Sequence, residues 1–292
     1  MRLKKLISSI ALSLNLFAIP AKTSATDHPH PRLISLAPHL TEMVFDLELQ
    51  QQLVAVDEYS NYPEAAKQLP KIGSGMDPNP ELLLRYGADI LLSYSAAPSI
   101  EKIAQNQGMT LMLSHPQSIP ELFADWRRLL ALAQKEPQKA AQIEDKILHI
   151  ETAWQETVAN YADSRSKSVF ILISEKPIYS LSDQSFLSQA LKSCKAENIF
   201  AEIKQSSFLV NPEDLLLKQP EFIIHGYRAD EENGKERSQR EVLARFKKLG
   251  LTLQSEQLIS VNVDILHRPT LRFINTLPSI CAALHKDNEP MH

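Results

Sequence analysis

Glycine, cysteine and long apolar runs are all scarce in this sequence of 292 residues. Its seven glycines form no GxxxxGK loop of the kind that cradles phosphates, and no GxSxG motif of a serine hydrolase occurs. After residue 25, no segment approaches the ~20 apolar residues that a transmembrane helix needs. These absences argue against a nucleotide-hydrolysing enzyme and against an integral membrane protein.

Residues 1–25 have the composition of a cleavable secretory signal. Three basic residues, Arg2, Lys4 and Lys5, precede an apolar run over residues 6–18, and small residues follow. The run is too short to span a bilayer stably, so we expect an exported, soluble mature protein. No cysteine follows the expected cleavage region, so lipid anchoring is not expected.

The charge balance after this signal is acidic. The signal holds four basic residues and no acidic one, so the remaining chain has 27 basic and 35 acidic residues, a formal net charge near −8. An acidic surface argues against nucleic acid and against anionic lipid as partners.

Cys194 and Cys281 are the only cysteines. In an exported protein an even count favours a disulfide, and the alternative is two unrelated buried thiols. A bridge would also leave no thiol nucleophile for catalysis.

The chain alternates strand-like and helix-like stretches, and the alternation starts twice. Residues 31–135 follow a βαβαβ rhythm, with one helix expected to be opened by Thr41 and Glu42, and residues 167–286 begin the rhythm again. This rhythm is typical of parallel sheets with helices on both faces. We therefore expect an α/β protein of two lobes, each with a mainly parallel sheet flanked by helices.

Residues 136–163 between the lobes predict one long helix. Pro137 suits its first position, no glycine interrupts it, and apolar residues recur at steps of three and four from Ile143 to Tyr161. About 25 helical residues extend ~37 Å, enough to join two small lobes as a stiff backbone. The alternative is a long peripheral helix of a single domain.

An Asn-Pro-Glu entry into an apolar run occurs twice, as "NPELLLRYGADIL" from residue 79 and "NPEDLLLKQPEFII" from residue 211. Asn79 and Asn211 are suited to cap helices, and Glu81 and Glu213 then face the positive end of the helix dipole. Each copy alone indicates a helix start. As a repeat, the two glutamates also form a pair of exposed carboxylates, one per lobe, for docking onto basic groups of a partner.

The segments "YSNYP", "NPELLLRYGADILL", "LKSCKAENIF" and "RPTLRFINTLPSIC" resemble the periplasmic cobalamin-binding proteins of ABC importers. These belong to the helical-backbone class of substrate-binding proteins, which also includes haem and siderophore binders. The resemblance implies a monomeric periplasmic protein without catalysis that carries cobalamin as its transported ligand. It also implies that Glu81 and Glu213 dock onto the membrane permease and that Cys194 pairs with Cys281.

The resemblance also implies a ligand cleft between the lobes, on loops that follow strands. The residues at matching positions are Tyr59, Tyr94, Tyr179, Phe208, Asp264, His267 and Arg268. Flat aromatic rings suit a flat macrocycle, and the polar residues suit the amide fringe of a corrin. The chain departs from the family pattern in three places: Gly75 and Phe208 replace tryptophans, and His267 replaces an acidic residue.

Three rival interpretations remain at this point. Haem binders of the same class present a tyrosine from a "YP" loop to the iron, and Tyr62-Pro63 stands in that place. A zinc or manganese site would draw on His39, His115, His225 and His267, although their spacing carries no metal signature and we expect no resident metal or cofactor. An exported hydrolase with a dispersed catalytic triad is the third.

Overall fold

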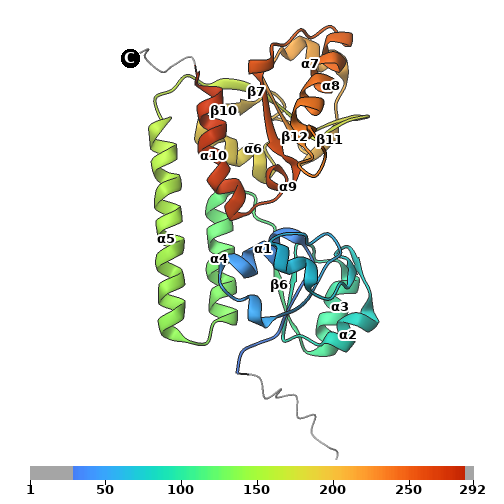
Figure 1. Cartoon of the computed structure of the whole chain (residues 1–292), viewed down its shortest axis with the longest axis vertical. Helices are drawn as coiled ribbons and strands as arrows, with labels where there is room; N and C mark the ends of the chain where they lie inside the picture. The colour runs from blue at the N-terminus through green and yellow to red at the C-terminus, as the bar shows by residue number, and fades with distance from the viewer. Residues whose placement is uncertain (1–28, 287–292) are drawn as a thin grey trace, which may run out of the picture.

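Two four-stranded parallel sheets organise the chain, one in each lobe (Figure 1). The computed structural model describes residues 29–286, so the predicted signal lies outside the described residues. The N-terminal sheet has the order β2 (Leu53–Val56), β1 (Leu33–Ser35), β5 (Ile90–Ser93) and β6 (Thr110–Leu113). The C-terminal sheet has the order β10 (Ala196–Asn198), β7 (Lys167–Leu172), β12 (Phe222–Tyr227) and β13 (Leu258–Asn262).

The two sheets repeat one topology. In each, the second strand along the chain lies at the edge, beside the first, and the third and fourth strands follow on the other side. The neighbouring strands are parallel in both sheets. The predicted fold class of two α/β lobes is confirmed.

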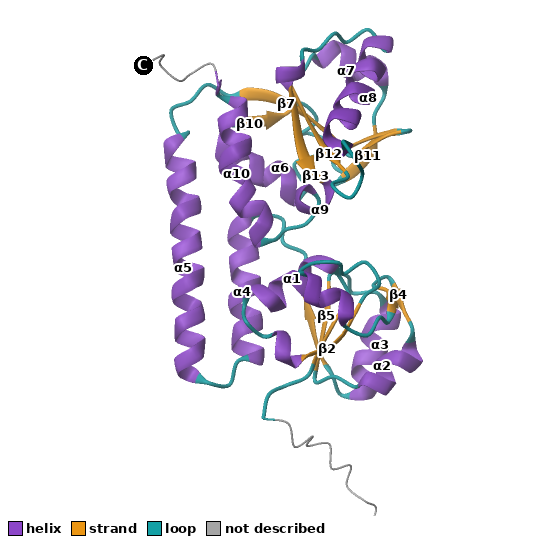
Figure 2. Ribbon diagram, viewed as in Figure 1, coloured by secondary structure: helices purple, strands orange, loops and turns teal. Residues whose placement is uncertain are grey.

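Helices flank the sheet of the N-terminal lobe (Figure 2). They are α1 (Pro38–Asp46), α2 (Pro80–Tyr86), α3 (Pro98–Gln107) and α4 (Ile119–Ala133), with short 3-10 turns η1 (Gln50–Gln52) and η2 (Glu64–Gln68). The prediction that Thr41 and Glu42 open the first helix is wrong. Pro38 is its first residue, and Thr41 and Glu42 are buried one turn later because their side chains bond to other elements.

The C-terminal lobe carries the remaining helices and a second, antiparallel sheet that the sequence pattern did not indicate. The helices are α6 (Phe186–Leu191), α7 (Pro212–Lys218), α8 (Gly234–Lys248), α9 (Val263–Leu266) and α10 (Leu271–Leu284), with η3 (Lys192–Cys194) and η4 (Ser255–Gln257). The antiparallel sheet has the order β11 (Ser207–Leu209), β9 (Ile178–Leu181) and β8 (Ser174–Glu175). A small ribbon of β3 (Gly73–Ser74) and β4 (Asp77–Pro78) belongs to the other lobe.

The predicted long helix is present as α5 (Pro137–Asn160), 24 residues without interruption, or about 36 Å. Figure 1 shows it beside both lobes, with α4 next to its lower half and α10 next to its upper half. Arg127 of α4 donates hydrogen bonds to Glu144 and Glu151 of α5, each at 2.7 Å. At the other end, Trp154 Nε1 donates to Ser193 Oγ at 3.0 Å.

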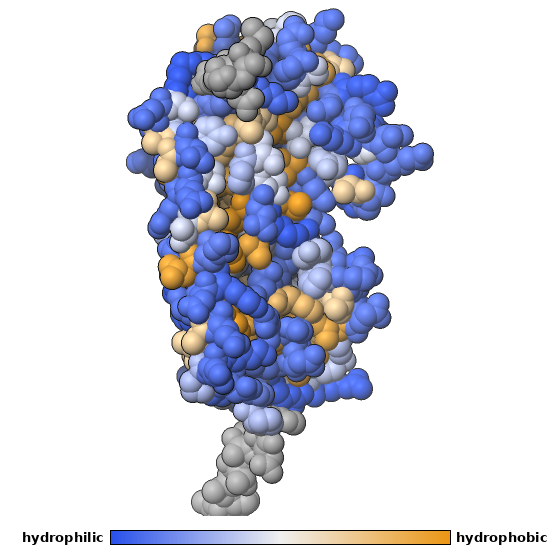
Figure 3. Space-filling view, turned by 60° about the vertical axis from the view of Figure 1, so that its left-hand side comes forward, coloured by the Kyte–Doolittle hydropathy of each residue, from blue (hydrophilic) through white to orange (hydrophobic). Residues whose placement is uncertain are grey.

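One apolar core runs through both lobes and the helices between them. Its buried members include Leu92 of the first sheet, Trp126 of α4, Ile147 of α5, Ile224 of the second sheet and Phe273 of α10. Because this packing is continuous, the lobes are joined by more than a connecting chain. In Figure 3, hydrophilic residues cover most of the α5 side, with apolar residues grouped near its middle. None of the helices in the described part of the chain has the length and apolarity that crossing a bilayer requires.

The predicted disulfide is present between Cys194 in η3 and Cys281 in α10. Both cysteines are fully buried, and the bridge closes a loop over 87 sequence positions. Because the closed loop runs from η3 to the last helix of the C-terminal lobe, it restricts the unfolded chain over most of that lobe.

Replacing Cys194 and Cys281 together by alanine should lower the free energy of unfolding by about 2–4 kcal/mol, since the open chain gains conformational freedom when unfolded. Urea unfolding followed by circular dichroism measures this difference. The untreated protein in excess reductant should show the same loss. An unchanged midpoint in both samples would show that the bridge does not stabilise the lobe.

Candidate functional site

A cavity of about 730 Å³ lies between the two lobes, where strands of both sheets end. The N-terminal lobe contributes residues after each strand of its sheet, namely Ala37, Pro38 and His39 after β1, Tyr59 after β2, Tyr94 after β5, and His115 and Pro116 after β6. The C-terminal lobe contributes Ile173 after β7 and the segment from Val263 that follows β13. Open α/β sheets bind ligands at such carboxyl ends, so the topology of both lobes points to one shared site.

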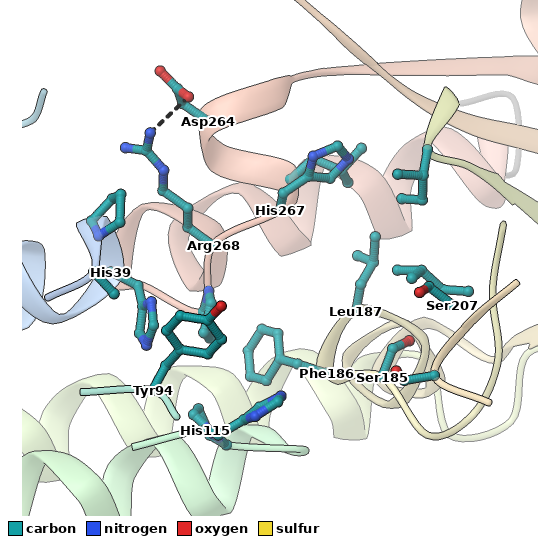
Figure 4. A pocket seen from close by; sticks show the side chains of 18 of the residues that line it. His39, Tyr94, His115, Ser185, Phe186, Leu187, Ser207, Asp264, His267 and Arg268 are labelled. Atoms are coloured by element: carbon teal, nitrogen blue, oxygen red, sulfur yellow. Dashed lines mark hydrogen bonds and ion pairs between the residues drawn. The ribbon is translucent and has the colours of Figure 1, made fainter. Parts of the chain in front are cut away.

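Aromatic rings form the wall on the N-terminal side (Figure 4). Tyr94 stands between His39 and His115, with ring centroids 6.5 Å and 6.1 Å away and both pairs edge to face. Burial lowers the pKa of His39 to about 4, and its Nε2 lies 3.3 Å from the Ser114 carbonyl oxygen. His39 is therefore neutral at physiological pH and held in place.

The opposite wall comes from the start of α6. Ser185 caps this helix by accepting a hydrogen bond from the Ser188 amide at 3.3 Å, which turns Phe186 and Leu187 towards the cavity. Phe186 packs edge-on against Phe273 of the core at 5.4 Å. The cavity thus has aromatic rings on two sides, polar ones on the N-terminal side and Phe186 on the other.

A buried ion-pair cluster at the cavity edge connects the lobes. Glu42 of α1 is only 2% exposed and accepts hydrogen bonds from Arg272 Nε at 2.8 Å and from Arg268 at 3.2 Å, both in the other lobe. Arg268 also pairs with Asp264 at 2.9 Å. Two arginines and two carboxylates balance one another. Burial, beside the Glu42 charge, raises the pKa of Asp46 to about 7, so this third carboxyl is largely protonated below neutral pH.

Asn61 extends this cluster across the mouth of the cavity. Its Oδ1 accepts from Arg268 at 2.7 Å and its Nδ2 donates to Asp264 at 2.9 Å. The neighbouring Tyr62 ring lies under the Arg272 guanidinium, 3.9 Å from its centroid. Both residues follow β2, so the loop after β2 is tied to the C-terminal lobe.

Five of the predicted ligand residues line the cavity, and two do not. Tyr59, Tyr94, Asp264, His267 and Arg268 are among the lining residues. Arg268 is engaged in the ion-pair cluster as well, which its sequence position did not indicate.

Tyr179 and Phe208 lie in the antiparallel sheet and are not among the lining residues. Phe208 packs on Phe200 in the lobe interior at 5.4 Å, and Tyr179 is 39% exposed. Side chains alternate between the faces of a strand, so Phe208 points away from the face of its neighbour Ser207, which lines the cavity. Tyr179 shares a face of β9 with the lining residue Leu181 but lies two positions further along the strand. Phe186 lines the cavity as well, although it was not among the residues expected to contact the ligand.

Glu81 and Glu213 are exposed at the starts of α2 and α7. The Asn79 and Asn211 side chains accept hydrogen bonds from the amides of these glutamates at 2.9 Å and 3.1 Å, as the capping pattern predicts. Each helix lies between the second and third strands of its sheet, so the two helices hold equivalent places in the repeat. Both lie on the side away from α5 in Figure 1.

Three histidines of the rival metal-binding interpretations, His39, His115 and His267, line the cavity, whereas Tyr62 and His225 lie elsewhere. Tyr62 lies against Arg272 and is not among the residues that line the cavity. His225 is buried in the C-terminal sheet, where Ser260 Oγ lies 2.8 Å from its Nε2, and burial lowers its pKa to about 4. No group of three or more metal-ligating side chains occurs among residues 29–286.

Two α/β lobes with a cavity between them are the architecture of two-lobed ligand-binding proteins. The chain belongs to the periplasmic binding protein family, whose sequence pattern matches residues 33–245. The expected membership of this class is confirmed.

Individual relatives cover nearly the whole chain. A vitamin B12-binding protein of Vibrio cholerae serotype O1 is 29% identical over 263 residues, 89% of this chain and 91% of the relative. The crystal structure of the periplasmic vitamin B12-binding protein BtuF of Vibrio cholerae has a TM-score of 0.74 and 26% identity, covering 90% of this chain and 99% of that one. The periplasmic haem-binding protein HutB of Vibrio cholerae shares the fold, with a TM-score of 0.70, 17% identity and coverage of 87% and 98%. All are binding proteins, in agreement with the expectation of binding without catalysis.

Replacing Glu42 by glutamine should lower the free energy of unfolding by about 3 kcal/mol, because it leaves the buried arginine charges without their partner. Thermal or urea unfolding measures the loss. Glu64→Gln is the matched control, since its pair with Lys67 is solvent-exposed and should contribute little. Equal effects of the two substitutions would show that the buried cluster does not hold the lobes together.

Proposed function

We propose that this protein is a periplasmic substrate-binding protein that captures a corrinoid, cobalamin in particular, in the cavity between its lobes and delivers it to an ABC transporter permease. The observation that carries the proposal is the match over about nine tenths of the chain to vitamin B12-binding relatives. The protein acts as a monomer after export, and hydrolysis of ATP belongs to other subunits.

The charges around the cavity favour a corrinoid over haem. Arg268 is the only lysine or arginine among the described residues that line the cavity, and Glu42 and Asp264 already neutralise it. Haem carries two propionate carboxylates, which need cationic partners when they leave water. The amide fringe of a corrin needs neutral donors and acceptors instead, and Gln184, Ser206 and Ser207 offer them at the cavity edge.

A second hollow, of about 530 Å³, adjoins the cavity and supports the same ligand class. It shares His115, Gln184 and Ser206 with the cavity and adds the side chains of Gln117 and Gln189. Its charged residues are the carboxylates Glu121 and Asp183. Such a lining suits amides and hydroxyls and would repel additional carboxylates.

Titration with cyanocobalamin should give a dissociation constant below about 1 μM by calorimetry, since the cavity is largely formed before the ligand arrives. Haem titrated under the same conditions should bind more weakly, because its propionates meet no free cation. Tight haem binding with no heat from cyanocobalamin would transfer the assignment to a haem carrier.

Tyr94→Ala and Tyr179→Ala form a matched pair for the same titration. Tyr94 lines the cavity and Tyr179 does not, so only the first substitution removes aromatic area from the site. A loss of cyanocobalamin affinity that is confined to Tyr94→Ala supports binding between the lobes. An equal loss in both variants would place the ligand elsewhere.

Replacing Glu81 and Glu213 together by alanine should weaken binding to the permease by about 100-fold or more, because each carboxylate is expected to meet a basic group in the interface. Binding of the loaded protein to the purified transporter in nanodiscs measures this. Ligand affinity should stay the same, since both glutamates lie outside the cavity.

The matched control for docking is the pair Asp145→Ala and Glu156→Ala, which removes two exposed carboxylates from α5. This double substitution changes the net charge by the same amount as replacing Glu81 and Glu213, and it should leave binding to the permease nearly unchanged. If both pairs weaken docking alike, the effect is one of net charge, and Glu81 and Glu213 serve only as helix starts.

A further inference from the structure

Three histidines line the cavity, and they differ in the hydrogen bonds that their ring nitrogens make with the protein. His39 has Nε2 close to the Ser114 carbonyl oxygen, as described above. His115 and His267 line the same cavity, and neither ring makes a hydrogen bond with any residue in the range 29–286. A ring nitrogen that the protein does not use is available to a ligand.

The two histidines that are 5% exposed or less show the contrast. His225 lies between two serine hydroxyls, with Ser260 Oγ 2.8 Å from Nε2. His285 has Nε2 2.8 Å from the Cys194 carbonyl oxygen. These two buried imidazoles each use a ring nitrogen within the protein, whereas His115 and His267 are exposed and leave their ring nitrogens open at the cavity.

The position of His115 is set by its surroundings. It follows β6 directly, and Tyr94 packs edge-on against its ring with an interplanar angle of 67°. Figure 4 shows His115 beside Tyr94 at the lower edge of the cavity, with Phe186 near it and His267 at the upper edge. A ring held by an aromatic neighbour loses little freedom when it binds a ligand.

The two charges beside His267 oppose each other. Burial lowers the pKa of His267, Asp264 opposes this lowering and Arg268 adds to it. Charge therefore does not separate the two histidines, whereas the edge-on contact with Tyr94 positions the ring of His115. This contact singles out His115.

We propose that His115 coordinates the metal ion at the centre of the bound corrinoid, an inference that rests on the proposed function above. The neutral imidazole nitrogen donates its lone pair to cobalt and displaces a water molecule from that axial position. One cobalt–oxygen bond breaks, one cobalt–nitrogen bond forms, and no electron is transferred. Imidazole is the commonest protein ligand of metal ions, and the metal of a planar macrocycle exposes its axial positions to the two faces.

This coordination makes the site sensitive to the axial group of its ligand. Aquocobalamin carries an exchangeable axial water, whereas cyanocobalamin carries a cyanide that imidazole does not readily displace. The protein should therefore prefer aquocobalamin over cyanocobalamin, and the preference should depend on His115.

The test uses absorption spectroscopy of the full mature protein with each of these two corrinoids. Aquocobalamin should show shifted absorption bands when bound, and cyanocobalamin should not. His115→Ala should abolish the shift and reduce the ratio of aquocobalamin to cyanocobalamin affinity about tenfold. His149→Ala, exposed on α5 outside the cavity, is the matched control and should keep both.

The outcomes separate this inference from the proposed function. A shift that persists in His115→Ala, or that disappears only in His267→Ala, overturns the assignment to His115. If the protein binds cyanocobalamin but gives no shift with aquocobalamin, coordination is absent and the proposed function still stands. If neither corrinoid binds, both the proposed function and the assignment of His115 as a cobalt ligand are wrong.

Discussion

The structure depends on a buried carboxylate that belongs to one lobe and has its partners in the other. Glu42 is almost fully buried in α1, and Arg268 and Arg272 reach it from the C-terminal lobe. Separating the lobes would leave the charges of Glu42 and Arg272 without partners, at a cost of several kcal/mol before any packing is lost. This cluster lies at the cavity edge, so it fixes the distance between the two walls that a ligand contacts.

The repeated topology explains why such a cavity exists. Both sheets have one strand order, and in both the strands end at the same cavity. The helices that start at Asn79 and Asn211 occupy the same step of each repeat, so one local motif places one exposed carboxylate in each lobe. The proposed ligand contacts and the proposed docking contacts therefore both follow from the repeated α/β lobe, and α5 packs beside both copies.

The sequence predicts those parts of the structure that depend on local pattern. The caps at Asn79 and Asn211 and the unbroken helix α5 depend on neighbouring residues, and they are present as expected. Glu42 looked like an ordinary residue at a helix start, because its arginine partners are about 230 positions away. Phe208 was expected on a loop that follows a strand, but it lies within β11, because the antiparallel pairing of β11 with β9 was not recognised.

The separation of the cavity walls and the chemistry of their side chains together favour the proposed ligand class. The core and the Glu42 cluster both join the two walls of the cavity, and this packing opposes a change in their separation. Arg268, the one arginine on its wall, is already neutralised from within the protein, so the site offers aromatic faces, neutral polar groups and imidazoles rather than free charge. A planar guest with a neutral polar fringe and a metal centre uses all three, whereas a charged guest would leave its own charges unpaired.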